Sequence, residues 1–327
     1  MQLNVIEQQR YIRQMTMPEV GETGQLKLKN ARILVVGAGG LATSLLPSLV
    51  GSGIGYIRLY DADVVDVSNL HRQTLYRMQD IGQAKVAAAQ QHLMQLNPYS
   101  MIEPHQQHVH SANIHVACDD IDLVVDAADR FATTYLLSNY CKAKKIPLVS
   151  ASVLLQKGYV GGFCGLNAPS YSAVFPQLPQ SAMSCAISGV LPSSVAVIAS
   201  LQAQMVLNII LGLQPSALGQ LLHIDLSHWH LQSFRFDTAP ESEDALSWLD
   251  EYQIQPEDIV LDLRHPDEVQ SDVATQVQYV QHADLDQMRF DGQQRIICAC
   301  ASGIRAAKAA QVLKQRGYQN LYILAAL

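Results

Sequence analysis

The stretch of residues 31–63, ARILVVGAGGLATSLLPSLVGSGIGYIRLYDAD, constrains the fold more than any other part of the chain. Near its start lies the short apolar run Ile33–Val36, which is typical of a buried strand. The pattern then predicts a helix over Leu41–Val50 and a second strand over Tyr56–Tyr60. A strand, a turn, a helix and a strand form the first unit of a doubly wound, Rossmann-like α/β domain.

Glycine fills the turn between the first strand and the helix, at Gly37, Gly39 and Gly40. Glycine lets the backbone approach a phosphate closely, while the helix N-terminus offers unpaired N–H groups and a partial positive charge. Asp61 follows about 20 residues later, where a carboxylate can hydrogen-bond a ribose hydroxyl. The turn indicates a nucleotide site with NAD or FAD as the default ligand; the alternative is a turn that serves packing alone.

Two basic residues after Asp61 change this interpretation. Arg72 and Lys85 both follow the second predicted strand, and Lys85 begins a predicted helix that runs to Leu96. An arginine and a lysine close behind a phosphate-binding turn suit a triphosphate, because it carries more charge than a pyrophosphate bridge. Taken singly, each residue would more often be a surface cation. Together they favour ATP.

Acidic residues end the predicted strand over residues 122–129, DLVVDAAD. Ligands of doubly wound sheets gather at the carboxyl ends of the strands, and a carboxylate near phosphates is a natural Mg²⁺ ligand. Asp129 is therefore the candidate metal ligand. The alternative is that Asp129 caps the helix predicted over Thr133–Lys145.

Length and composition limit the class of protein. A chain of 327 residues suits two domains, and a net charge of −7 argues against non-specific nucleic-acid binding. The polar N-terminus lacks the apolar segment of a signal peptide, and polar side chains interrupt the apolar stretch Val190–Leu213, which predicts a buried helix and no membrane span. Six cysteines in such a chain are expected to be reduced, as in the cytoplasm.

Several short motifs follow one another over residues 8–236: RYIRQ, VGAGGLA, LYDADVVDVSNLHRQTL, DIGQAK, DLVVDAADR and SCAISGVLP. In this order they resemble the ThiF/MoeB family, the ubiquitin-activating-like adenylyltransferases of sulfur-carrier proteins. The resemblance implies ATP and Mg²⁺ as cofactors. It also implies a nucleotide site formed by Gly37, Gly39, Gly40, Asp61, Asp63, Asn69, Arg72, Gln73, Lys85 and Asp129, in which Asp61 would hold the ribose and Asp129 the metal.

The same resemblance implies the catalytic groups of this part of the chain. Arg72, Lys85 and Asp129 would act together with Arg13, which would reach the ATP of the other subunit in a homodimer. Cys185 matches the family cysteine that carries acyl or sulfur adducts in some members; the alternative is an inert buried thiol.

Two features depart from the family pattern. Many members hold zinc with two CxxC pairs, but residues 170–173 here are Ser-Tyr-Ser-Ala, and no second pair follows Phe234. Thiolates hold such a site, so we expect no zinc. In addition, Arg130 stands after Asp129, where asparagine is common in the family.

The C-terminal part has its own signature. The acidic residues 237–246 predict a linker, after which strands are predicted over Asp258–Arg264 and Arg295–Cys300. LDLRHPDE and CASGIR resemble a rhodanese domain, which implies that Cys300 carries sulfur while backbone N–H groups and Arg305 favour its thiolate. The alternative is a core cysteine. The region is short and lacks a GHIPGA-like segment, so a weakened or regulatory rhodanese-like domain is also possible.

These inferences predict an adenylating domain over residues 1–236 and a small α/β rhodanese-like domain over 247–327. The expected function is ATP-dependent adenylation of the C-terminal glycine of a small ubiquitin-fold sulfur carrier, followed by sulfur transfer that gives a thiocarboxylate for thiamin, molybdopterin or a related product. A sulfur donor such as a cysteine desulfurase is the expected second partner. The alternatives are adenylation of a small molecule or peptide, a nucleotide-binding scaffold without turnover and, least supported, an NAD oxidoreductase.

Overall fold

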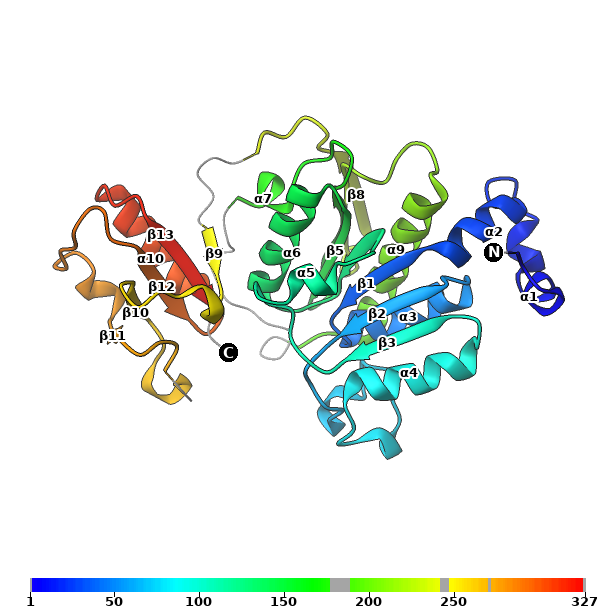
Figure 1. Ribbon diagram of the computed structural model, residues 1–327, viewed down its shortest axis with the longest axis horizontal. Helices are drawn as coiled ribbons and strands as arrows, with labels where there is room; N and C mark the ends of the chain where they lie inside the picture. Colours follow the sequence, from blue (N-terminus) through cyan, green and yellow to red (C-terminus); the bar gives the residue numbers. More distant parts are fainter. Residues whose placement is uncertain (1, 177–188, 242–246, 270–271, 326–327) are drawn as a thin grey trace.

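The computed structural model describes residues 2–176, 189–241, 247–269 and 272–325, which form two β-sheets with helices packed on them (Figure 1). The first sheet belongs to residues 2–241, here called the N-terminal unit. The second belongs to residues 247–325, the C-terminal unit.

Within the described residues, the first sheet has eight strands in the order β3-β2-β1-β4-β5-β6-β7-β8. The strands from β1 to β5 pair in parallel, and β6, β7 and β8 continue the sheet in antiparallel fashion. This order confirms the predicted doubly wound sheet, whose parallel strands end at one common edge. The strands are β1 (Arg32–Val36), β2 (Tyr56–Tyr60), β3 (Met101–His105), β4 (Leu123–Asp126), β5 (Pro147–Leu154), β6 (Lys157–Cys164), β7 (Gln220–Asp225) and β8 (His230–Arg235).

Helices cover both faces of this sheet (Figure 1). Ile33 and Val35 of β1 pack with α3, α4 and α9 on one face, and Leu34 and Val36 pack with α5 and α6 on the other. A strand covered on both faces is apolar at consecutive positions, which explains why Ile33–Val36 of β1 are all apolar. The helices of the N-terminal unit are α1 (Val5–Met15), α2 (Gly21–Asn30), α3 (Gly40–Gly51), α4 (Lys85–Leu96), α5 (Ile114–Ala117), α6 (Phe131–Lys144), α7 (Tyr171–Val174) and α9 (Pro192–Leu211), with 3-10 turns η1 (Val67–Asn69) and η2 (Met78–Asp80).

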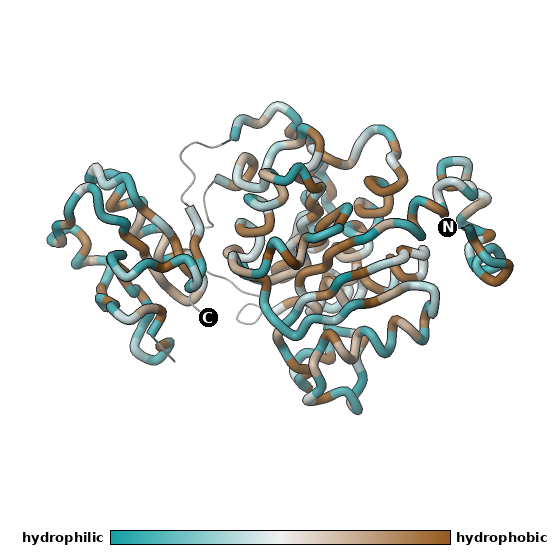
Figure 2. The backbone as a smooth tube through the Cα atoms, viewed as in Figure 1, coloured by the Kyte–Doolittle hydropathy of each residue, from teal (hydrophilic) through white to brown (hydrophobic). Residues whose placement is uncertain are grey.

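Helix α9 is the most apolar long helix among the described residues, and its length and composition alone would suit a membrane span. It instead contacts α3, β5 and β6, and Ile198, Ala203 and Val206 are fully or almost fully buried in the core. Figure 2 shows this hydrophobic helix beside the hydrophobic strands of the first sheet. The expected buried helix is therefore confirmed.

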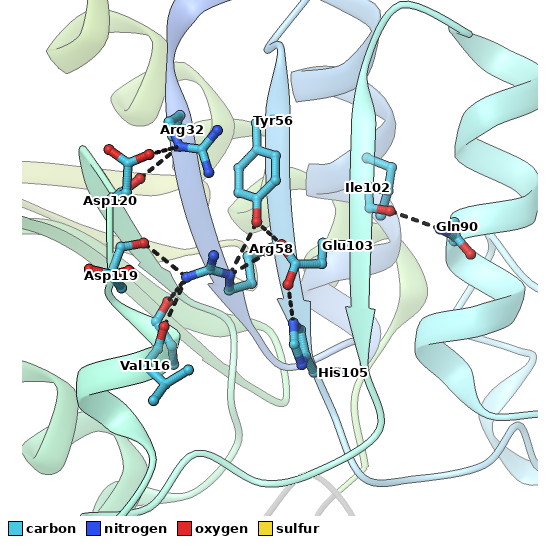
Figure 3. Close-up of polar contacts among 11 residues, drawn as sticks. Arg32, Tyr56, Arg58, Gln90, Ile102, Glu103, His105, Val116, Asp119 and Asp120 are labelled. Carbon is cyan, nitrogen blue, oxygen red and sulfur yellow. Dashed lines mark hydrogen bonds and ion pairs between the residues drawn. The ribbon is translucent and has the colours of Figure 1, made fainter.

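A polar network fixes the end of the sheet at β2 and β3 (Figure 3). Arg58 and Glu103 are register partners on these strands; Glu103 accepts hydrogen bonds from Tyr56 and Arg58 and pairs with His105 at 2.6 Å. Arg58 also donates to the carbonyl of Val116 at the end of α5. The network therefore fixes His105, the last residue of β3, where the following loop begins.

The C-terminal unit is a parallel sheet of five described strands in the order β11-β10-β12-β13-β9. The central strand β12 is buried throughout, and Ala306 and Leu313 of α10 pack on it. This α/β unit begins at β9, which lies at the edge beside β13. Its elements are β9 (Ser247–Leu249), η3 (Glu251–Gln253), β10 (Ile259–Asp262), η4 (Pro266–Glu268), β11 (Val277–Tyr279), η5 (His282–Asp284), β12 (Ile296–Cys300), α10 (Ile304–Gln315) and β13 (Leu321–Ala325).

Candidate functional site

The glycine turn lies between β1 and α3, at the carboxyl edge of the parallel strands. Gly37 has φ +99°, and a Cβ atom there would lie 2.6 Å from the carbonyl oxygen of Ala127. Any other residue at position 37 would have a strained backbone conformation, and its Cβ would also clash with the backbone that follows β4. Gly39 is the N-cap residue of α3, and no side chain accepts a hydrogen bond from the first turn of this helix. The N–H groups of that turn therefore stay available for a ligand.

Asp61 directly supports this turn. Its Oδ2 accepts the backbone N–H of Ala38 at 2.6 Å, and its Oδ1 accepts the N–H of Asp63 at 2.8 Å. Burial raises the pKa of the Asp61 carboxyl, while these hydrogen bonds and the charge of Lys85 oppose the rise. Each oxygen retains a lone pair, so a ribose hydroxyl could still donate to it.

Lys85, at the start of α4, reaches the same edge. Its ammonium lies 2.7 Å from the Asp63 carboxylate; the Lys85 side chain is 5% exposed and that of Asp63 is 62% exposed. The lysine stem is therefore buried while its charge meets a carboxylate that faces solvent. A phosphate arriving at the turn would compete with Asp63 for this ammonium.

Arg72 and Gln73 follow the short turn η1. The carbonyl of Asn69 accepts the backbone N–H groups of both residues at 3.0 Å, which turns them toward the glycines. A Cβ at Gly40 would lie 3.7 Å from Arg72 Cγ, and one at Gly39 would lie 3.8 Å from Gln73 Nε2. Gln73 is 3% exposed, and its Oε1 is buried without a hydrogen-bond partner. A buried acceptor beside the turn is a group that a ligand could satisfy.

Asp129 follows β4 at the same edge and is exposed. Arg130 holds the N-cap position of α6, and no side chain caps that helix. The alternative that Asp129 caps α6 is therefore wrong, and its carboxylate stays available for a cation. Burial lowers the pKa of Arg130, and the negative charges of Asp129 and Glu251 counteract that effect.

Asp126, the last residue of β4, is a buried acid that the sequence analysis did not single out. It accepts hydrogen bonds from Thr134 Oγ1 at 2.7 Å and Ser150 Oγ at 2.8 Å. Burial raises its pKa to about 6, although both hydroxyls lower it. The sequence signal that could have identified Asp126 is an acid at the end of the otherwise apolar strand β4. Asp126 ties β4 to α6 and β5 beneath the predicted metal ligand.

Replacing Asp126 with asparagine should remove a pH dependence of stability. The pKa of about 6 in the folded state exceeds the ordinary aspartate value of 3.8, so the folded state binds this proton more tightly. Wild-type protein should therefore lose up to about 3 kcal/mol of unfolding free energy as pH rises from about 4 to above 6. Urea unfolding of both proteins across this range measures the difference. Parallel stability profiles would contradict the prediction.

Arg13 does not reach the site of its own chain. The neighbouring Gln14 bonds the carbonyl of Ser52 at 3.0 Å, which is the end of α3 opposite the glycine turn. Twelve helical residues separate the two ends, a rise of roughly 18 Å. Figure 1 likewise shows α1 beyond the N-terminal end of β1, away from the carboxyl end where the glycine turn lies. Arg13 is exposed, so a second subunit could meet it.

The segment around Ser170, where family members carry a CxxC pair, is joined to residue 241 by polar contacts. Ser170 donates its N–H and its hydroxyl to Glu241, at 3.0 and 2.5 Å. Lys142 lies 2.8 Å from the same carboxylate. Among the residues that the structure describes, no group of three or more His, Cys, Asp or Glu is placed to hold a metal.

Cys300 ends β12, and its sulfur is enclosed by the following loop. Its Sγ accepts the backbone N–H of Gly303 at 3.1 Å and that of Ala306 at 3.4 Å. These are the donors expected for a stabilised thiolate. The Cys300 side chain has no exposed surface, which fits the alternative of a core cysteine as well. The ring of Trp248 covers the loop, since a Cβ at Gly303 would lie 2.4 Å from it.

Arg305 lies in the first turn of α10 and is held by Glu268. Its Nη2 donates to both carboxylate oxygens of Glu268 at 2.6 Å. Burial alone would raise the pKa of Glu268, but the hydrogen bonds from Arg305 bring it below the usual range. Arg305 Nη1 is buried without a partner, which leaves one donor available near the loop.

The other cysteines differ in setting. Cys118, Cys141, Cys164 and Cys298 are buried and free, and burial raises the pKa of Cys298 to about 12. Such thiols are poor nucleophiles at neutral pH. Cys185 lies outside the described residues.

The predicted nucleotide residues thus meet at one edge of the first sheet. A glycine turn, an acid after the second strand and a lysine at the start of the next helix define a nucleotide-binding α/β protein. The chain belongs to the ThiF family, whose profile matches residues 11–245.

Named relatives extend the comparison. The chain is 40% identical over 235 residues to the adenylyltransferase and sulfurtransferase MOCS3 of Culex quinquefasciatus, covering 71% of this chain and 53% of that protein. It is 39% identical over 226 residues to the sulfur carrier protein adenylyltransferase of Thermus thermophilus, covering 67% and 83%. The chain therefore spans about half the length of the MOCS3 relative.

Solved structures share the fold. MccB of E. coli, in a complex with MccA-N7isoASN, has a TM-score of 0.64 at 22% identity and covers 72% of this chain and 74% of its own. PaaA has a TM-score of 0.59 at 23% identity, with 72% and 75% covered.

Proposed function

We propose that this chain adenylates the C-terminal carboxylate of a small ubiquitin-fold sulfur carrier and then delivers sulfur to it. The observation that carries the proposal is that Arg72 and Gln73 lie beside Gly40 and Gly39, while Lys85 reaches the Asp63 carboxylate at the same edge of the sheet. The names of the relatives from Culex and Thermus support adenylation of a sulfur carrier. We assign adenylation to residues 1–236, sulfur handling to 247–327 and the connection to a linker over 237–246, in a homodimer of the reducing cytoplasm.

In the first step, a carboxylate oxygen of the carrier attacks the α-phosphorus of ATP. The bond from that phosphorus to the bridging oxygen breaks, and pyrophosphate leaves. Lys85, Arg72 and Arg13 of the partner subunit offer positive charge to the oxygens on which negative charge develops. The buried stem of Lys85 holds its ammonium in place before the substrate binds.

The residues present fit a magnesium ion. Asp129 is an exposed carboxylate at the phosphate edge that caps no helix, and Mg²⁺ prefers carboxylate and phosphate oxygens. Asp129 would hold the metal, which would neutralise charge on the phosphates. Arg130 places a positive charge beside that carboxylate.

In the second step, the outer sulfur of a persulfide on Cys300 attacks the carbonyl carbon of the acyl adenylate. A carbon–sulfur bond forms, the carbon–oxygen bond to phosphate breaks, and AMP leaves. The resulting acyl disulfide is cleaved by a second thiol, which becomes disulfide-bonded to Cys300 and releases the thiocarboxylate. Cys185 is the candidate for that thiol, and a cysteine desulfurase is the candidate sulfur donor.

The direct test is ATP–pyrophosphate exchange measured with and without a candidate carrier ending in Gly-Gly. We expect exchange that depends on the carrier, together with a thiocarboxylate product of matching intact mass. Exchange without any carrier, or with a free amino acid in its place, would overturn the substrate assignment.

Mixing two inactive variants tests the role of Arg13 across a dimer interface. Arg13→Ala and Lys85→Ala homodimers should each lose exchange activity. A mixture should recover up to about a quarter of the wild-type rate, because half of the dimers are hybrids and one of their two sites has both residues. Mass spectrometry of the intact assemblies checks that hybrids form. No recovery despite hybrid dimers would show that Arg13 does not act in trans.

A further inference from the structure

A cavity of about 360 Å³ lies between the two units, next to the nucleotide residues. The N-terminal unit contributes Ala62, which stands between Asp61 and Asp63, together with Val109 and Thr133. The cavity therefore continues the site from the Asp61 end, away from the glycine turn. Its opposite wall is the segment Trp248–Gln253 of the C-terminal unit, here called the docking segment.

Specific contacts hold the docking segment against the N-terminal unit. Asp250 accepts hydrogen bonds from the N–H and the hydroxyl of Ser111, the latter at 2.6 Å. The ring of Tyr252 stacks on that of His110, with centroids 4.1 Å apart and planes 20° apart. The network around Glu103 fixes the start of this loop (Figure 3).

The docking segment is also anchored at its other end. Trp248 stacks on Tyr135 of α6, with centroids 5.2 Å apart and an angle of 15° between the planes. Offset aromatic pairs of this kind contribute beyond the area they bury. Arg130 donates to the carbonyl of Ala325 in β13 at 3.5 Å. The cavity therefore has two walls from distant parts of the sequence, both fixed by paired side chains.

The chemistry of the walls favours a neutral aromatic ligand. Asp250 and Glu251 place two carboxylates in the outer wall against the single guanidinium of Arg130, so these groups leave no excess positive charge for a phosphate. Aromatic rings and the apolar side chains of Ala62 and Val109 suit a planar group. The Nδ1 atom of His110 is buried without a hydrogen-bond partner, and an imidazole nitrogen can pair with the donors or acceptors on a purine edge.

We propose that the docking segment is the outer wall of the base subsite, so that a nucleobase and the docked C-terminal unit stabilise each other. The inference rests on the proposed function, because it takes ATP as the ligand. Linkage makes the effect reciprocal: if docking tightens base binding, the base tightens docking by the same factor. The unit that carries Cys300 is thereby held at the site while nucleotide is bound.

Tryptophan fluorescence tests this linkage in the full chain. The sequence has two tryptophans, and Trp229 is 85% exposed. The Trp229→Phe variant therefore keeps Trp248 as its one fluorescent tryptophan and removes no buried side chain. ATP should change the Trp248 emission, and tripolyphosphate, which has no base, should not. Calorimetry run in parallel measures whether each ligand binds. Binding of ATP without any change in emission would overturn the inference and leave the proposed function standing.

The Tyr252→Ala variant tests the wall itself. It should weaken ATP binding about tenfold, as expected for loss of one aromatic surface at a base, while tripolyphosphate affinity stays unchanged and shows that the fold is intact. Tyr279→Ala, which removes a comparably exposed tyrosine at the other edge of the C-terminal unit, is the matched control and should bind ATP normally. Equal ATP affinity in Tyr252→Ala and Tyr279→Ala would refute the inference. Absence of ATP binding by the parent protein would overturn the proposed function as well.

Discussion

The Asp129→Ala variant should lose ATP–pyrophosphate exchange by at least about a hundredfold. Its carboxylate is the exposed acid at the phosphate edge and caps no helix, so its loss removes the proposed metal ligand and little else. The variant should unfold at the same urea concentration as wild type. Initial rates of exchange at saturating ATP and carrier measure the effect.

A matched control is available on the opposite edge of the sheet. Asp120 is an exposed acid that precedes β4 and pairs with Arg32 at 2.9 Å. Because a surface ion pair contributes little, Asp120→Ala should keep full exchange activity. If both variants kept their activity, Asp129 would not be the metal ligand. If both lost it equally, the effect would be structural.

The Cys300→Ala variant should lose thiocarboxylate formation to the limit of detection and keep exchange activity. The reason is that the Cys300 sulfur sits among N–H groups of a loop in the C-terminal unit, whereas the adenylation residues lie in the N-terminal unit. Intact mass of the carrier and pyrophosphate exchange are measured on the same preparation.

Cys298→Ala is the control for this experiment. Cys298 lies two residues earlier on β12, is equally buried, and has its pKa raised to about 12 by burial. It should support normal thiocarboxylate formation. Normal product from Cys300→Ala would mean that another protein delivers the sulfur and that the C-terminal unit serves to dock or regulate.

The sequence predicted those parts of the fold whose pattern is local. The apolar run of β1, the glycine turn and the start of α4 at Lys85 are all where the periodicity and breakers indicated. The side chains that converge on the turn could be named because their order along the chain is characteristic of the family. Their contacts, such as the pair of Lys85 and Asp63, required the structure.

Other elements gave no usable pattern. β3 reads MIEPH, and β8 is exposed along its whole length, so neither shows the alternation of a half-buried strand. β9 has three residues next to an acidic segment, which is too short for any period to appear. The sequence left open whether Cys300 is a core cysteine, and it could not predict the contact of Trp248 with the loop at Gly303, because the two are distant in sequence.

The hydrogen bonds from Ser170 to Glu241 determine which solution conditions weaken this part of the N-terminal unit. A hydroxyl, a carboxylate and the ammonium of Lys142 make the connection, and none of these groups is oxidised as a thiol is or removed by a chelator. Burial would raise the pKa of Glu241, but bonds from Lys142 and Ser170 lower it, so the carboxylate stays charged into mildly acidic solution. The connection is weakened by acid and by salt, and it is indifferent to thiol oxidants and to the supply of zinc.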